Sequence, residues 1–170
     1  MPPELTEVLG RLLADPALRA EFRRDPEGTS ARLGAPLRGI DPGALERQAA
    51  SLVAKRLHET AKLMPRTFRR LGPAARELFG GFATTFWPRG HRRHLEDAVA
   101  FGRFLLAGGV RALSRSEFNR LRFALEGGRW ALRLVGDAPA RGRKRPALQV
   151  LWRDNTGSVR SAALWIGLPF

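Results

Sequence analysis

The sequence contains no cysteine and no tyrosine, and it has no long uncharged apolar run. The absence of cysteine excludes a disulfide framework, a thiolate zinc site and a cysteine nucleophile. A membrane-spanning helix needs about 18 or more consecutive apolar residues, which this chain does not have. The first residues also lack the basic-then-apolar layout of a signal peptide. We therefore expect a cytoplasmic protein that does not enter a membrane.

Acidic residues are scarce: the sequence has 16 of them and 30 basic residues, which gives a net charge of +14. Such an excess favours acidic partners, namely nucleic acid, an anionic membrane, or an acidic peptide or protein. Only three of the basic residues are lysine, and the arginines accompany many Ala, Gly, Pro and Leu residues. This bias is typical of GC-rich coding, so part of the charge reflects the genome rather than the function.

Apolar residues recur every three to four positions through the first 127 residues, which predicts six or seven helices. Asp15, Asp25 and Asp41 each precede a proline, an arrangement that is typical of a helix start. The longest helix is expected from residue 42 to about Met64, where the next residue is a proline. The residues 114–117 read Ser-x-x-Glu, the signature of a capping box.

The pattern changes to a period of two after residue 128, which predicts strands near 130–135, 147–153 and 158–166. The expected fold class is α+β, with an N-terminal helical bundle at 1–127 and a small three-stranded antiparallel sheet at 128–170, packed on the helices. The hairpin register stays open. A three-residue loop would place Trp152 on one face with Arg160, and a four-residue loop would place it with Val159 and Ser161.

The sequence contains no recognisable set of catalytic residues. No glycine-rich loop joins a strand to a helix, and no hydrolase, nucleotide-binding or metalloprotease motif occurs. His91 and His94 share a spacing that suits a metal, but two arginines lie between them and no cysteine completes the site. We therefore expect no enzyme activity, no metal and no cofactor. We expect two groups of arginines on solvated helix faces, or in basic patches if they converge in space: Arg66, Arg69 and Arg70, and the pair at 92 and 93.

The densest basic run lies at 141–146 and contains Arg141, Arg143, Lys144 and Arg145. Its Arg-Gly-Arg core is similar to AT-hook peptides, which lie in the narrow minor groove of DNA. A solvated loop between two strands is the other interpretation. The four tryptophans are expected to pack in the core or on the sheet.

A small sheet also leaves an edge strand, whose unpaired backbone groups can bind an extended peptide. Basic residues on or beside the strands would favour an acidic peptide. The candidate peptide-binding residues are Leu148, Val150, Trp152, Arg153 and Arg160, and a proline at Val150 is expected to abolish binding.

Several segments resemble a known family: LLADPALRAEF at 12–22, KRLHE at 55–59, LMPRTFRRLG at 63–72, FWP at 86–88, HLED at 94–97 and the helix at 101–105. They are similar to the small helical partner proteins of multinuclear non-haem iron-dependent oxidative enzymes. Those enzymes are TIM-barrel proteins that modify ribosomally made peptides. The resemblance covers roughly residues 5–107, and the C-terminal sheet stands where such partners carry a peptide-docking sheet.

The resemblance implies a non-catalytic accessory subunit that binds the leader of a precursor peptide and docks on the oxidative enzyme as a hetero-oligomer. The iron ligands would then belong to the enzyme. The alternative function is a small nucleic-acid-binding or regulatory protein that acts through the basic residues at 141–145.

Overall fold

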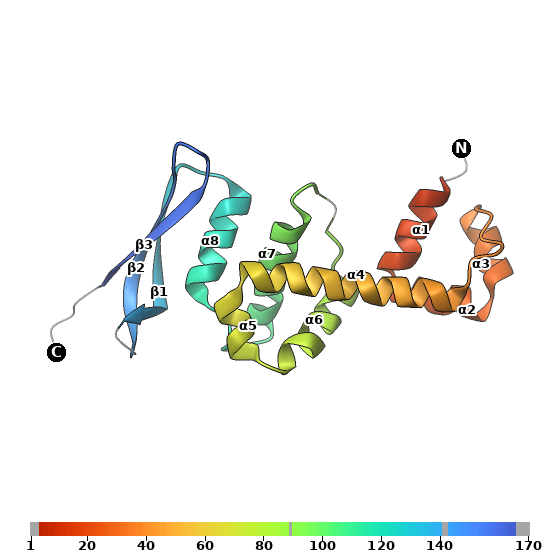
Figure 1. Ribbon diagram of the computed structural model, residues 1–170, viewed down its shortest axis with the longest axis horizontal. Coiled ribbons are helices and arrows are strands. Elements are labelled where there is room, and N and C mark those ends of the chain that lie inside the picture. The colour runs from red at the N-terminus through yellow and green to blue at the C-terminus, as the bar shows by residue number, and fades with distance from the viewer. Residues whose placement is uncertain (1–3, 89, 141–142, 166–170) are drawn as a thin grey trace. The chain divides into compact units, whose positions relative to one another are not determined.

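The computed structural model describes residues 4–88, 90–140 and 143–165. Within them, eight helices precede three strands that form one antiparallel sheet, which confirms the α+β class (Figure 1). The helices are α1 (Leu5–Ala14), α2 (Pro16–Arg24), α3 (Pro26–Leu33), α4 (Pro42–Leu63), α5 (Pro65–Leu71), α6 (Ala74–Thr85), α7 (Arg93–Ala107) and α8 (Arg115–Glu126). The strands are β1 (Trp130–Ala140), β2 (Arg143–Arg153) and β3 (Val159–Trp165).

The three Asp-Pro pairs start helices, as the sequence predicts. The Asp15 carboxylate accepts hydrogen bonds from the backbone amides of Ala17 and Leu18 at 2.9 and 3.1 Å. Asp25 and Asp41 accept equivalent bonds at the starts of α3 and α4. The proline that follows each aspartate has no N–H to leave unsatisfied, so this pair suits the first turn of a helix.

The described chain divides into two compact units. The first comprises the residues up to Leu57 together with Gly80–Trp87, and the second comprises His58–Phe79 and the residues from Pro88 onward. The sheet therefore lies in the same unit as α7 and α8. None of the described helices combines the length and hydrophobicity that a bilayer-spanning segment requires.

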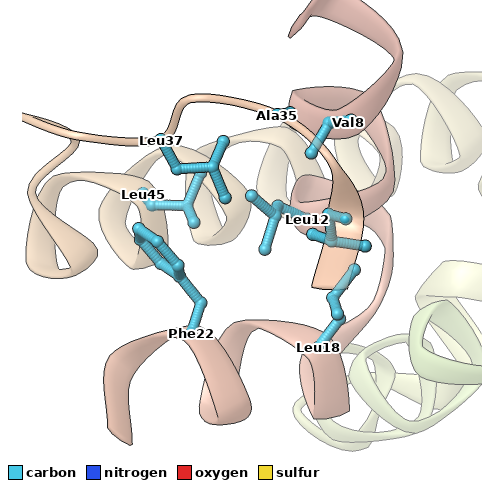
Figure 2. Close-up of a cluster of buried hydrophobic side chains, with 8 residues drawn as sticks. Val8, Leu12, Leu18, Phe22, Ala35, Leu37 and Leu45 are labelled. Carbon is cyan, nitrogen blue, oxygen red and sulfur yellow. The ribbon is translucent and has the colours of Figure 1, made fainter. Parts of the chain in front are cut away.

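The core of the first unit consists of apolar side chains from α1, α2, α3, the segment between α3 and α4, and the start of α4 (Figure 2). Val8, Leu12 and Phe22 are completely buried there. Each such side chain contributes about 1.5–3 kcal/mol of burial free energy. In this unit the Arg56 guanidinium donates to the Phe86 carbonyl at 2.9 Å and lies 4.9 Å from the Trp87 ring centroid.

The core of the second unit is built around phenylalanine rings. Phe101 on α7 lies with its ring centroid 5.6 Å from that of Phe68 on α5 and 5.1 Å from that of Phe79 on α6. Helix α7 packs closely on α8, because Gly102 has no side chain. A Cβ atom there would lie 2.7 Å from one carbon of the Phe118 ring and closer still to another. α8 in turn contacts all three strands.

The sheet has the strand order β1-β2-β3, so β2 is central. Trp130 pairs with Trp152, and Trp152 pairs with Arg160 on β3. Of the two registers that the sequence left open, the structure has the one that places Leu148, Val150 and Trp152 on a face with Arg160, Ala162 and Leu164.

The described residues contain eight helices rather than the expected six or seven, and two further expectations about local structure are wrong. Strand β1 continues to Ala140, past a register shift between Val135 and Ala138, and β2 already begins at Arg143. Most of the basic run therefore belongs to a strand and not to a loop between shorter strands. Helix α8 begins after Ser114 as expected, but Ser114 makes no side-chain capping bond and the capping box does not form. Glu117 binds another helix instead, as described below.

Candidate functional site

The two faces of the sheet differ sharply. One face packs on α8 and buries Val135, Ala147, Gln149 and Leu151. The other face, which we call the outer face, is apolar and exposed in the described part of the chain. It consists of Trp130, Leu132, Leu134, Leu148, Val150, Trp152, Ala162 and Leu164, with Arg160 at one end. Leu148 and Val150, on the central strand, are only partly exposed.

The exposure of the outer face is large for apolar side chains. Trp130 and Leu134 are each 70% exposed, and Leu164 is 57% exposed. Of the two expected settings for the tryptophans, Trp130 has the second: it lies on the sheet, where it pairs with the partly exposed Trp152, and not in the core. Exposed apolar patches of this kind mark surfaces that contact another molecule.

Polar contacts fix the inner side of the sheet to α8. The buried Gln149 amide donates to the Ser116 carbonyl at 3.0 Å, at the start of the helix. At the other end, Arg153 donates to the carbonyls of Phe123 and Ala124 at 3.4 and 2.9 Å. A cation is favourable at this position, because the last carbonyls of a helix carry partial negative charge. α8 thus holds the sheet at both of its ends.

Backbone hydrogen bonds show which groups point away from the sheet. The Asp154 amide donates to the Ser158 carbonyl, and the Arg153 amide donates to the Arg129 carbonyl. Because bonded and non-bonded pairs alternate in an antiparallel ladder, the N–H and C=O groups of Ser161 and Ala163 point outward on β3. Within the described residues, no strand pairs with that side of β3.

A groove of about 380 Å³ runs beside this free edge. On the strand side it is lined by Ser161, Ala162 and Ala163 of β3 and also by Val135 and Gln149 on the inner face of the sheet. Arg66 and Arg120 line it on the helix side. Arg66 is exposed and Arg120 is partly buried. No acidic side chain among the described residues pairs with either guanidinium, so the groove is basic next to a row of free backbone groups.

The remaining charged residue of this groove, Glu117, is fully occupied by contacts within the fold. Its carboxylate accepts hydrogen bonds from the backbone amides of Arg66 and Thr67 at 2.7 and 2.9 Å, and from the Thr67 hydroxyl at 2.9 Å. The Thr67 hydroxyl in turn accepts from the Ser114 amide at 3.0 Å. The buried Glu117 therefore caps α5 from α8 and holds Arg66 at the groove.

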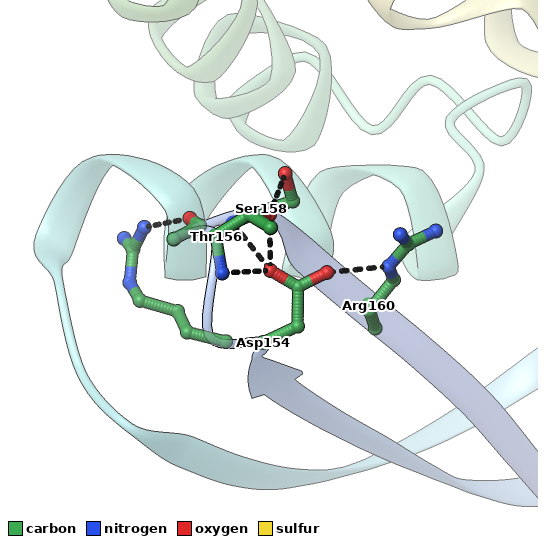
Figure 3. Close-up of polar contacts among 6 residues, drawn as sticks. Asp154, Thr156, Ser158 and Arg160 are labelled. Carbon is green, nitrogen blue, oxygen red and sulfur yellow. Dashed lines mark hydrogen bonds and ion pairs between the residues drawn. The ribbon is translucent and has the colours of Figure 1, made fainter.

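The turn between β2 and β3 is fixed by Asp154 (Figure 3). Its carboxylate accepts from the Thr156 hydroxyl and amide, from the Ser158 amide at 3.0 Å, and from Arg160 Nε at 2.8 Å. The bond from the Thr156 hydroxyl and the one from Arg160 lower the pKa of Asp154 from 3.8 to about 2. The carboxylate therefore stays ionised and holds β3 in register.

The structure places the candidate peptide-binding residues in three different settings. Leu148, Val150 and Trp152 lie on the outer face, but on the central strand, so their backbone groups bond to β3 rather than to a ligand. Arg160 lies on the same face on β3 and pairs with Asp154. Arg153 points to the other side and binds α8.

The alternative site at 141–145 lies largely beyond what the structure describes. Arg141 falls outside the described residues, and so do the side chains of Arg143, Lys144 and Arg145, although the backbone of these three belongs to β2. His91 and His94 are both exposed and line a second groove. Across the described residues, no three His, Asp or Glu side chains gather as a metal-ligand set.

Nothing in the sequence pattern marks Arg120, Ser161 or Ala163 as site residues. Arg66 was recognised only as a member of a basic stretch. No local signal marks these positions, because the free edge is a property of the strand order and Arg120 reaches it only through the packing of α8. β3 has three consecutive small residues, 161–163, and the register alone shows that Ser161 and Ala163 face the groove.

The comparison with protein families concerns the helical part of the chain. Residues 32–107 match the model of a family described as SCO6045-like, C-terminal domain. The match ends at the last residue of α7, so it leaves out α8, the sheet and most of the groove. No curated protein and no solved structure matches the chain. Residues 32–107 are thus similar to the SCO6045-like C-terminal domain.

Proposed function

We propose that this chain is a non-catalytic accessory protein that captures an extended precursor peptide on the free edge of β3. It presents the peptide to an iron-dependent oxidative enzyme of the TIM-barrel type, on which its helices dock. The observation that carries the capture step is the groove of about 380 Å³ beside the outward backbone groups of Ser161 and Ala163. The enzyme partner rests on the resemblance of the helical segments.

The backbone of β3 supports binding of a strand. An added strand exchanges hydrogen bonds with the outward N–H and C=O groups, and this supplies affinity that does not depend on sequence. Ser161 and Ala163 are small, so they leave the groove open for the side chains of the ligand. The hairpin that Asp154 fixes presents this edge without further ordering.

The charge of the groove supports an acidic ligand. Arg66 and Arg120 flank the edge, and the protein as a whole carries +14. Positive potential accelerates the encounter with an acidic peptide and orients it along the groove.

A proline at the free edge tests the capture step. Ala163→Pro removes an outward N–H that the β2–β3 ladder does not use, and the ring blocks an incoming strand. We expect tagged wild-type protein, isolated from its native host, to retain both a TIM-barrel iron enzyme and a short precursor peptide, as measured by mass spectrometry. The Ala163→Pro protein should retain the enzyme and lose most of the peptide.

Leu132→Pro is the matched control, because it removes an outward N–H at the opposite edge of the sheet, on β1. It should leave peptide recovery unchanged. Val150→Pro is unsuitable, since its N–H belongs to the ladder between β2 and β3 and the change would break the sheet. Equal peptide recovery with Ala163→Pro and wild type would contradict capture at β3, and recovery of neither partner by the wild type would contradict the whole proposal.

A further inference from the structure

Two grooves follow the free edge of β3 and share one side chain, Arg120. The first lies beside Ser161–Ala163, and the second, of about 520 Å³, lies beside Gly157 and Val159. Together they accompany the whole edge from the turn to Ala163. An extended ligand can therefore follow β3 over several residues at about 3.4 Å per residue.

The helix side of both grooves is basic. Arg66 and Arg120 line the first groove, and His91, Arg92 and His94 line the second. Among the described residues that line them, the one acidic side chain is Glu117, whose carboxylate already accepts three hydrogen bonds. Carboxylates of a ligand thus find cationic groups and no free negative charge on this side.

The outer side of the edge is apolar. Ala162 and Leu164 point away from α8 and continue across the sheet into Val150 and Leu148, and then into Leu132 and Leu134 on β1. A strand that pairs with β3 directs alternate side chains to the two faces of the sheet. Residues opposite Ser161 and Ala163 enter the groove, and residues opposite Ala162 and Leu164 extend the apolar outer face.

We propose, resting on the function proposed above, that the captured segment is an acidic–apolar alternating strand. Its carboxylates lie opposite Ser161 and Ala163 and pair with Arg66 and Arg120. Its apolar side chains lie beside Ala162 and Leu164 and cover part of the exposed outer face. Selection then depends on the order of residues in the peptide as well as on its net charge.

Synthetic peptides of equal composition test this inference. We compare fluorescein-labelled ten-residue peptides in which five Glu and five Val either alternate or form two blocks, and a third in which Lys replaces Glu in the alternating order. Fluorescence anisotropy with the full chain should give an affinity for the alternating acidic peptide about tenfold above that for the block peptide. The lysine peptide should not bind measurably.

Variants of the protein locate the contact. Arg120→Gln should weaken binding of the alternating acidic peptide by about fivefold, because Arg120 is partly buried beside the edge. Arg103→Gln removes an exposed arginine of α7 that lines neither groove, and it should leave the affinity unchanged. Ala163→Pro should abolish binding of the alternating peptide.

The outcomes separate this inference from the function on which it rests. Equal affinity for alternating and block peptides, with both lost in Ala163→Pro, would overturn the alternating pattern and leave capture at the edge intact. Binding that survives Ala163→Pro would overturn both, since the peptide would then lie elsewhere. Failure of every acidic peptide to bind would also overturn both.

Discussion

At the scale of single residues, Glu117 shows how one carboxylate can serve two helices. The sequence places it three residues after Ser114, which is a capping-box spacing within α8. In the fold its carboxylate instead turns to α5, where the amides of Arg66 and Thr67 and the Thr67 hydroxyl converge on it. The start of α5 offers several unpaired N–H groups and the positive end of the helix dipole. These stabilise a buried carboxylate better than the single amide that a capping box within α8 would supply.

The substitution Glu117→Gln tests this contact. The NH₂ group of the new glutamine would face backbone N–H and hydroxyl groups that are themselves hydrogen-bond donors. At least one of these buried donors would therefore lose its acceptor. We expect a loss of about 2 kcal/mol in unfolding free energy, seen as a fall of roughly 6 °C in Tm by calorimetry. Glu126→Gln, which breaks an exposed pair with Arg122, is the control and should change stability by less than about 0.5 kcal/mol. Equal losses in both variants would contradict the capping role.

At the scale of elements, the β2–β3 hairpin depends on one turn. Asp154 accepts bonds from Thr156, Ser158 and Arg160, and these bonds hold its pKa at about 2. The folded-state pKa is lower than the ordinary value of 3.8. Stabilisation of the hairpin is therefore complete above about pH 4 and is lost as the pH falls toward 2.

This predicts how an Asp154→Asn protein compares with wild type. Near pH 6 the variant should be less stable, because the amide cannot replace all the bonds that the carboxylate accepts. The difference should shrink as the pH falls from about 4 to about 2, since wild type then loses the same charge. Denaturant unfolding at several pH values, with amide exchange at Thr156 and Ser158, measures it. A difference that stays constant down to about pH 2 would refute the role of the ionised carboxylate.

The strand order also decides what the hairpin can do. Most of the candidate binding residues expected from the sequence lie on β2. Since β2 is central, the free backbone groups belong to β3 and β1. The element that we propose as the binding strand is thus the shorter strand, β3, which the sequence pattern alone does not single out.

At the scale of the whole molecule, the charge of +14 is the dominant property. From this charge alone we expect a weak, non-specific attraction to nucleic acid, driven by release of counterions from the phosphates. The arginines are spread over both compact units, so no single run accounts for this attraction.

We therefore expect weak binding of duplex DNA that falls at least about tenfold between about 50 and 200 mM salt. Changing Arg141, Arg143, Lys144 and Arg145 to Gln removes four of the 30 basic residues and should weaken DNA binding only a few-fold. Electrophoretic mobility shift at fixed salt measures this. Loss of most of the affinity in that variant would instead favour the alternative nucleic-acid function of this run.

Local sequence was enough to establish the fold class, the helix starts at the Asp-Pro pairs, the end of α4 before Pro65 and the existence of a small antiparallel sheet. These features depend on neighbouring residues: a cap, a missing N–H or an apolar period acts within a few positions. Only the tertiary structure decided four other features: the hairpin register, the central position of β2, the hydrogen-bond partners of Glu117, and the approach of Arg66 and Arg120 to β3. Each of these depends on contacts between residues far apart in the sequence, where several arrangements satisfy the same local pattern and packing selects one.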